Sequence, residues 1–145
     1  MSLVFIGFMG AGKTSAARAV AAELGTRPLD SDTVLVERMG MSIEDCFATR
    51  GERAFRELEE DAVLDLLDRV GDDDGAVVSL GGGAVTSDRV QDALRGHTVV
   101  LLDIDVDTAW QRAGGRRPLA RDRRRFDELH AERVPLYERR IGWQR

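Results

Sequence analysis

The order of apolar and polar positions along this chain predicts short strands that alternate with helices. Continuous apolar runs at residues 3–6, 76–80 and 98–102 have the length of strands buried on both faces of a sheet. Residues 28–30 form a further short candidate strand. Because strands that alternate with helices build parallel sheets, we expect an α/β fold.

Segments with the helical spacing of apolar residues lie between these strands, and the clearest of them follows Gly51. The apolar face of that helix comprises Phe55, Leu58, Ala62, Leu66 and Val70. Other helices are predicted over residues 13–24, 32–39, 88–94, 107–112 and 122–132. Ser42 and Asp45 resemble a capping box that opens one more helix. Pro118 and Pro135 are expected to interrupt helices, because proline lacks an N–H donor.

Length and composition narrow the class of protein. We expect a single domain over residues 1–145, with no run near the roughly 18 apolar residues of a membrane span. Lys13 is the only lysine among 21 basic residues, so lysine clusters cannot supply affinity for nucleic acid or a membrane. The single cysteine, Cys46, excludes an internal disulfide, fits a reducing cytoplasm, and is expected to be a packed residue.

Charge is spread unevenly along the chain. Residues 1–111 carry 10 basic and 21 acidic groups, whereas residues 112–145 carry 11 arginines and 5 acidic groups. The basic segment is either a helix surface with solvated salt bridges or a face directed at an anionic ligand. Composition leaves both interpretations open.

Residues 7–14 match the phosphate-binding loop pattern GxxxxGK[ST], with a predicted strand before them and a helix after them. Gly10, Ala11 and Gly12 can direct backbone N–H groups at phosphate oxygens. Lys13 would reach the β- and γ-phosphates, and the Thr14 hydroxyl would bind Mg²⁺. The loop predicts a nucleoside triphosphate but does not define the reaction.

Two further segments follow predicted strands, where open α/β sheets bind ligands. One carboxylate of the pair Asp30 and Asp32 can orient water on Mg²⁺ while the other accepts a hydrogen bond from a substrate hydroxyl. A turn with a helix cap is the alternative. Gly81, Gly82 and Gly83 either allow the backbone to approach a ligand closely or form a plain loop.

Arginines provide the remaining candidates. Arg56 lies beside the apolar stripe of the long helix, where Glu59 can hold its guanidinium ready for a carboxylate; an ordinary surface pair is the alternative. The arginine-rich segment at about 113–125 is typical of a lid that closes over phosphates. Arg133 offers another fixed guanidinium near the end of the chain.

Six short motifs follow one another along the chain: GFMGAGKT, LDSD, GERAFRELE, LGGGAVTS, RRPLA and ERVPLY. In this order they resemble the shikimate kinase family over nearly the whole chain. The resemblance implies a three-layer α/β/α P-loop fold with a parallel sheet of order 2-3-1-4-5. It also implies transfer of the γ-phosphoryl group of ATP, with Mg²⁺, to the 3-hydroxyl of shikimate. The family's last strand and helix are expected to be absent here, as in a fragment, which leaves residues 98–102 at an edge. We therefore expect a monomer unless another element pairs with that edge.

The same resemblance assigns roles by position. The shikimate-binding residues would be Asp32, Arg56, Gly81, Gly82, Gly83 and Arg133. ATP would be bound by Gly10, Ala11, Gly12, Lys13, Thr14, Ser15, Arg112 and Arg117, with Arg112 against adenine. Thr14 and, through water, Asp30 would hold the metal, and Lys13, Asp32 and Arg117 would be catalytic. A gluconate-type kinase and a non-catalytic nucleotide-binding module are the alternatives.

Overall fold

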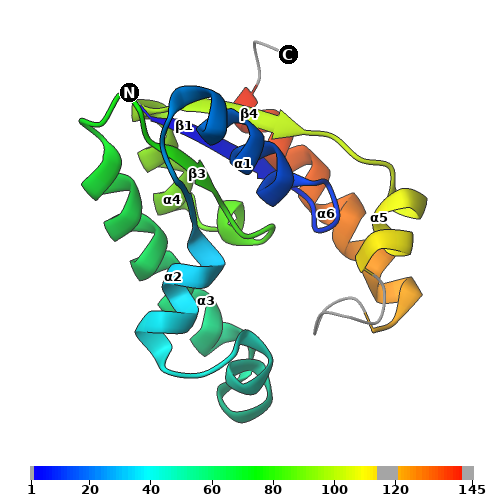
Figure 1. The fold of residues 1–145 in the computed structure, drawn as a ribbon. Coiled ribbons are helices and arrows are strands. Elements are labelled where there is room, and N and C mark those ends of the chain that lie inside the picture. Colours follow the sequence, from blue (N-terminus) through cyan, green and yellow to red (C-terminus); the bar gives the residue numbers. More distant parts are fainter. Residues whose placement is uncertain (1, 114–120, 142–145) are drawn as a thin grey trace.

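The computed structural model describes residues 2–113 and 121–141, and it has a parallel β-sheet between helices (Figure 1). The strands are β1 (Leu3–Gly7), β2 (Pro28–Asp30), β3 (Val77–Ser79) and β4 (Thr98–Leu102). Their order in the sheet is β2-β3-β1-β4, and every neighbouring pair is parallel. The predicted α/β class and the strand order 2-3-1-4 are confirmed.

Helices cover both faces of this sheet. They are α1 (Lys13–Leu24), α2 (Ser31–Met39), α3 (Ile43–Val70), α4 (Asp88–Ala93), α5 (Val106–Ala113) and α6 (Arg123–Ile141), with short 3₁₀ turns η1 (Ala84–Thr86) and η2 (Leu94–Gly96). Alternate residues of β1 point to opposite faces. Phe5 packs with Ala17 of α1, whereas Val4 packs in a larger cluster that includes Leu66 of α3 and Phe126 of α6. The expected three layers follow from this alternation.

Polar caps begin helices α2 and α3. The Asp30 carboxylate accepts hydrogen bonds from the backbone N–H groups of Asp32 and Thr33, and it caps α2. The Ser42 hydroxyl accepts the N–H of Asp45 over 3.0 Å at the start of α3, so the predicted cap is confirmed. Gly51 interrupts α3 with φ of 84°, a left-handed value that glycine adopts without steric cost.

Pro135 does not end the last helix, and that prediction is wrong. Helix α6 continues through the proline to Ile141. Leu129, Arg133 and Tyr137 follow one another at four-residue intervals, and all three are buried. The packing of this face on both sides of Pro135 offsets the loss of one helical hydrogen bond.

Strand β4 lies at the edge of the four-stranded sheet that the described residues form, as expected. Its apolar run predicts burial on both faces, yet Thr98 is exposed and the next four residues are half-buried. Cys46 is fully buried in a cluster with Leu35, Phe55 and Ala62, which confirms it as a packed residue. No helix in residues 2–113 or 121–141 combines the length and apolar character needed to cross a membrane.

Candidate active site

The phosphate-binding loop connects the central strand β1 to helix α1. Gly10 and Gly12 have φ values of 85° and 90°, which only glycine adopts readily. A Cβ atom on Gly10 would lie 3.0 Å from the carbonyl oxygen of Ala109, so helix α5 packs directly against the loop. Arg112 of the same helix donates a hydrogen bond to the carbonyl of Gly10 over 3.0 Å. The loop is therefore supported from the side on which Arg112 was expected to meet adenine.

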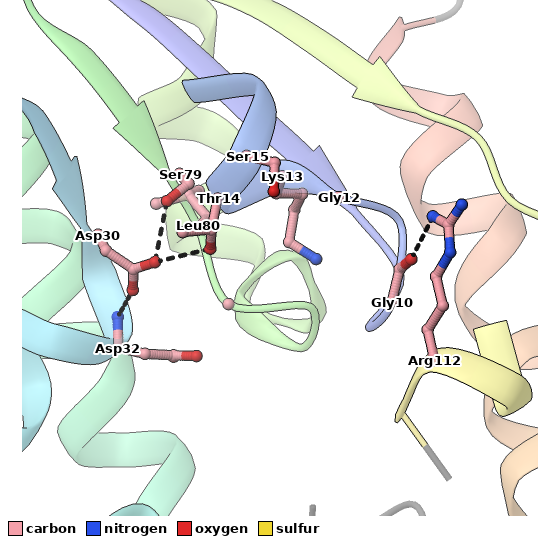
Figure 2. Close-up of a pocket in the computed structure, with 11 residues that line it drawn as sticks. Gly10, Gly12, Lys13, Thr14, Ser15, Asp30, Asp32, Ser79, Leu80 and Arg112 are labelled. Carbon is pink, nitrogen blue, oxygen red and sulfur yellow. Dashed lines mark hydrogen bonds between the residues drawn. The ribbon is translucent and has the colours of Figure 1, made fainter. Parts of the chain in front are cut away.

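Lys13 is nearly buried at the first turn of α1. Its ammonium group donates to the carbonyl oxygens of Gly7, at 2.7 Å, and Phe8, at 3.0 Å. Figure 2 shows the side chain extending from the start of α1 into the pocket, between Thr14 and Gly10. This position brings the positive charge of the only lysine into the pocket beside the phosphate-binding loop.

A hydroxyl–carboxylate cluster lies beside the loop where β2, β3 and α1 meet (Figure 2). The Asp30 Oδ2 atom accepts hydrogen bonds from Thr14 Oγ1 at 3.2 Å and from Ser79 Oγ at 3.1 Å. The other carboxylate oxygen of Asp30 caps α2. Asp30 thus serves both as the helix cap that was the alternative and as one member of the predicted pair with Thr14. Hard hydroxyl and carboxylate oxygens are ligands that suit Mg²⁺.

These groups line one cavity of about 520 Å³. It brings together predicted residues from three separate motifs of the sequence: the phosphate-binding loop, the Asp30–Asp32 segment and the glycine triplet. The residues that line it are Gly10, Gly12, Lys13, Thr14, Ser15, Asp30, Asp32, Ser79, Leu80, Gly81 and Arg112. Nucleotide-side and acceptor-side candidates therefore share one pocket.

Arg56 and Glu59 form the predicted pair on α3, with Nη1 of Arg56 2.6 Å from Oε1 of Glu59. Glu59 is buried, and burial raises the pKa of its carboxyl group although the Arg56 cation opposes the shift. Arg133 of α6 is also buried, and burial lowers the pKa of its guanidinium. Two guanidinium groups and one carboxylate thus lie close together, with the Glu59 carboxylate beside Asp32 and Gly81. Arg56 and Glu59 line a second cavity of about 220 Å³.

The glycine triplet makes room for side chains of this cluster. A Cβ atom on Gly81 would lie 2.6 Å from Oδ1 of Asp32, and one on Gly83 would lie 2.5 Å from Cζ of Arg56. Real Cβ atoms do not come so close to other atoms, so the two side chains need these glycines. The sequence predicts that a ligand approaches the glycine backbone closely. In the structure, the Asp32 and Arg56 side chains make part of this close approach.

Gly82 lies between the phosphate-binding loop and α6. A Cβ atom there would lie 3.3 Å from the backbone nitrogen of Met9 and 3.6 Å from Nη1 of Arg133. Its carbonyl accepts a hydrogen bond from the Tyr137 hydroxyl over 2.5 Å. Tyr137 is not among the site residues predicted from the sequence. The available signal was its spacing of four residues from Arg133, which places both on one helix face.

The arginines that the structure describes between residues 121 and 133 divide into two groups. Arg121, Arg123, Arg124 and Arg125 pair with nearby carboxylates at the surface, as in the solvated interpretation. Buried Arg133 instead lies near Arg56 and Glu59, as in the anionic-ligand interpretation. Arg117 and most of the expected lid lie outside the described residues.

The loop, its lysine and the hydroxyl–carboxylate pair at the ends of parallel strands define a P-loop nucleotide-binding protein. The fixed arginines beside them provide a place for an anionic second ligand. A family model described as shikimate kinase matches residues 9–141. The chain belongs to the shikimate kinase family.

Comparisons with individual shikimate kinases support this assignment. The shikimate kinase of Mycobacterium bovis is 48% identical over 141 residues, which cover 94% of this chain and 78% of that protein. The shikimate kinase of Mycobacterium marinum is 45% identical, with 94% and 74% covered. The structure of Acinetobacter baumannii shikimate kinase in complex with shikimate matches with a TM-score of 0.83 and 31% identity, covering 96% of this chain and 79% of that one. Shikimate kinase of Aquifex aeolicus matches with a TM-score of 0.78 and 27% identity, covering 96% and 82%.

Proposed function

We propose that this chain transfers the γ-phosphoryl group of ATP to the 3-hydroxyl of shikimate, in the pathway to the aromatic amino acids. The observation that carries the proposal is the placement of Arg56 and Arg133 around Glu59, whose carboxylate lies beside Asp32 at the wall of the pocket that holds Lys13. A small acceptor with a carboxylate at one end and hydroxyls at the other fits this order of groups. The solved relative from Acinetobacter baumannii holds shikimate.

The nucleotide side is formed by the phosphate-binding loop. The backbone N–H groups of residues 10–15 and the Lys13 ammonium would hold the phosphates, and the dipole of α1 adds positive potential there. Arg112 lies beside the loop, where it can border the adenine. Arg117 would be the lid arginine that acts on the phosphates.

Thr14 and Asp30 would hold Mg²⁺, Asp30 through a water molecule. Their oxygen atoms already lie 3.2 Å apart, and both are hard ligands of the kind that this ion binds. When bound, the ion supplies neutralising charge for the phosphates.

On the acceptor side, Asp32 would accept a hydrogen bond from the attacking hydroxyl and orient it for in-line transfer. Its Oδ1 atom lies against the backbone of Gly81, which fixes the carboxylate at the pocket wall. Arg56 and Arg133 would bind the shikimate carboxylate at the other end of the molecule. Phosphoryl transfer depends mostly on such positioning and on charge neutralisation, which these residues supply.

A panel of acceptors tests this function. ADP release is measured by a coupled assay with ATP, Mg²⁺ and either shikimate, gluconate or a nucleoside monophosphate. We expect ADP release only when shikimate is the acceptor. Release with gluconate alone would favour the gluconate-type kinase, and ATP binding without release for any acceptor would favour a non-catalytic module.

We further propose that residues 1–145 act as a single kinase domain in the cytoplasm, as a monomer unless the edge at β4 is paired, without nucleic-acid or membrane partners. The buried free thiol of Cys46 and the need for ATP support this location. Light scattering of the purified chain checks the oligomeric state.

A further inference from the structure

Tyr137 joins the C-terminal helix to the glycine triplet by one buried hydrogen bond. Its hydroxyl donates to the carbonyl of Gly82 over 2.5 Å, across 55 positions of the chain. Burial raises the pKa of Tyr137 to about 12, although the neighbouring Arg133 guanidinium opposes the shift. The phenol therefore keeps its proton, and remains a donor, at the pH values at which kinases are assayed.

The same face of α6 carries Arg133 and Tyr137, which are four residues apart. Pro135 lies between them and has no N–H, so α6 lacks the hydrogen bond to the carbonyl of Ala131. The bond from Tyr137 to Gly82 anchors the helical turn that follows this missing bond. One hydroxyl thereby holds the helix of Arg133 against the glycine triplet.

The bond also sets the direction of a peptide group. The carbonyl of Gly82 and the N–H of Gly83 belong to one planar trans peptide and point in opposite directions. Tyr137 fixes the carbonyl end of that peptide, and the Arg56 guanidinium packs on Gly83 at its other end. Both carboxylate-binding arginines are therefore connected, through this peptide and through α6, to one hydrogen bond.

We propose that Tyr137 is a positioning residue for the acceptor: it holds the Gly82–Gly83 peptide so that Arg56 and Arg133 converge on one ligand carboxylate. It acts through the backbone of Gly82, through α6 and through its own contact with the Arg133 guanidinium. The identity of that ligand as shikimate rests on the function proposed above.

The test is the variant Tyr137→Phe, which keeps the buried ring and removes only the hydroxyl. We expect the KM for shikimate to rise about fivefold to tenfold, the factor expected for one lost hydrogen bond. The KM for ATP and kcat should stay within about twofold, because the phosphate-binding loop keeps its own contacts.

A matched control is Gln91→Met. Gln91 is buried, and its amide donates to the backbone carbonyl of Val85, at 2.6 Å, in the turn that follows the triplet. This variant loses a buried side-chain bond at the turn η1 rather than at the Gly82–Gly83 peptide, so its KM for shikimate should not change.

Three results would overturn the inference. The first is an active Tyr137→Phe variant with an unchanged KM for shikimate, which leaves the proposed function standing. The second is an equal rise in Gln91→Met, which would reduce the effect to general loss of stability. The third is a wild-type chain that releases no ADP with shikimate, which overturns the proposed function as well.

Discussion

The Arg56 guanidinium packs against the backbone of Gly83, so that a methyl group at Gly83 would lie 2.5 Å from Cζ of Arg56. Gly83 has φ of −94°, which alanine adopts without strain, so Gly83→Ala should fold. The flexible arginine must move aside, and we expect about tenfold weaker shikimate binding with ATP binding nearly unchanged. Titration calorimetry with each ligand measures both.

The control for this variant is Gly96→Ala. No atom lies within 4 Å of a Cβ placed on Gly96, so its binding of both ligands should match the wild type. Arg56→Ala sets the upper limit of the effect. Equal loss of shikimate and ATP binding in Gly83→Ala would argue against a carboxylate role for Arg56.

Asp32→Asn should abolish most turnover. The amide keeps the size of the side chain but loses the negative charge that would orient the acceptor hydroxyl, and we expect kcat to fall about a hundredfold or more. Steady-state ADP release checks this value, and thermal unfolding confirms that the variant folds. A near-normal kcat would remove Asp32 from the mechanism.

Lys13→Arg tests whether the loop needs a compact ammonium group. The Lys13 ammonium donates to two loop carbonyls from a nearly buried position, where a planar guanidinium is not an equivalent replacement. We expect activity to fall about a hundredfold or more while the far-ultraviolet circular dichroism spectrum is retained. Full activity in this variant would contradict the assigned role of the lysine.

Glu59→Gln should change how stability depends on pH. The pKa of Glu59 is raised in the folded protein above its ordinary value of 4.5, so the folded state binds this proton more tightly than the unfolded state. The free energy of unfolding of the wild type should therefore fall relative to the variant as pH rises from 4.5 through the raised pKa.

Denaturant titrations of both proteins between pH 4 and neutrality provide the measurement. The exposed Glu57 on the same helix offers the matched control, since Glu57→Gln removes one carboxylate at the surface. A difference that moves the other way would mean that Arg56 outweighs burial and lowers the Glu59 pKa.

The sequence was sufficient for those parts of the molecule that depend on local pattern. The loop of residues 7–14 follows from its motif, the cap at Ser42 from side-chain chemistry, and the strands from continuous apolar runs. The pairing of Arg56 with Glu59 follows from their spacing on one helix. The strand order came from the family resemblance.

Contacts between distant segments could not be predicted in this way. Helix α6 continues past Pro135 because the buried side chains of Leu129 and Tyr137 stabilise it there. No local sequence pattern indicates this continuation. The bond from Tyr137 to Gly82 joins positions that only the folded chain brings together. The triplet indicates a close approach, but only the structure identifies Arg56 as the group that approaches Gly83.

The proposed reaction is the transfer of the γ-phosphoryl group of ATP to shikimate in this pocket. The most direct measurement is phosphorus-31 NMR of the products formed from ATP, Mg²⁺ and shikimate by the purified chain. We predict one shikimate phosphate ester per ADP, with the phosphorus coupled to the hydrogen on carbon 3. ADP formed together with free inorganic phosphate and unchanged shikimate would contradict the claim.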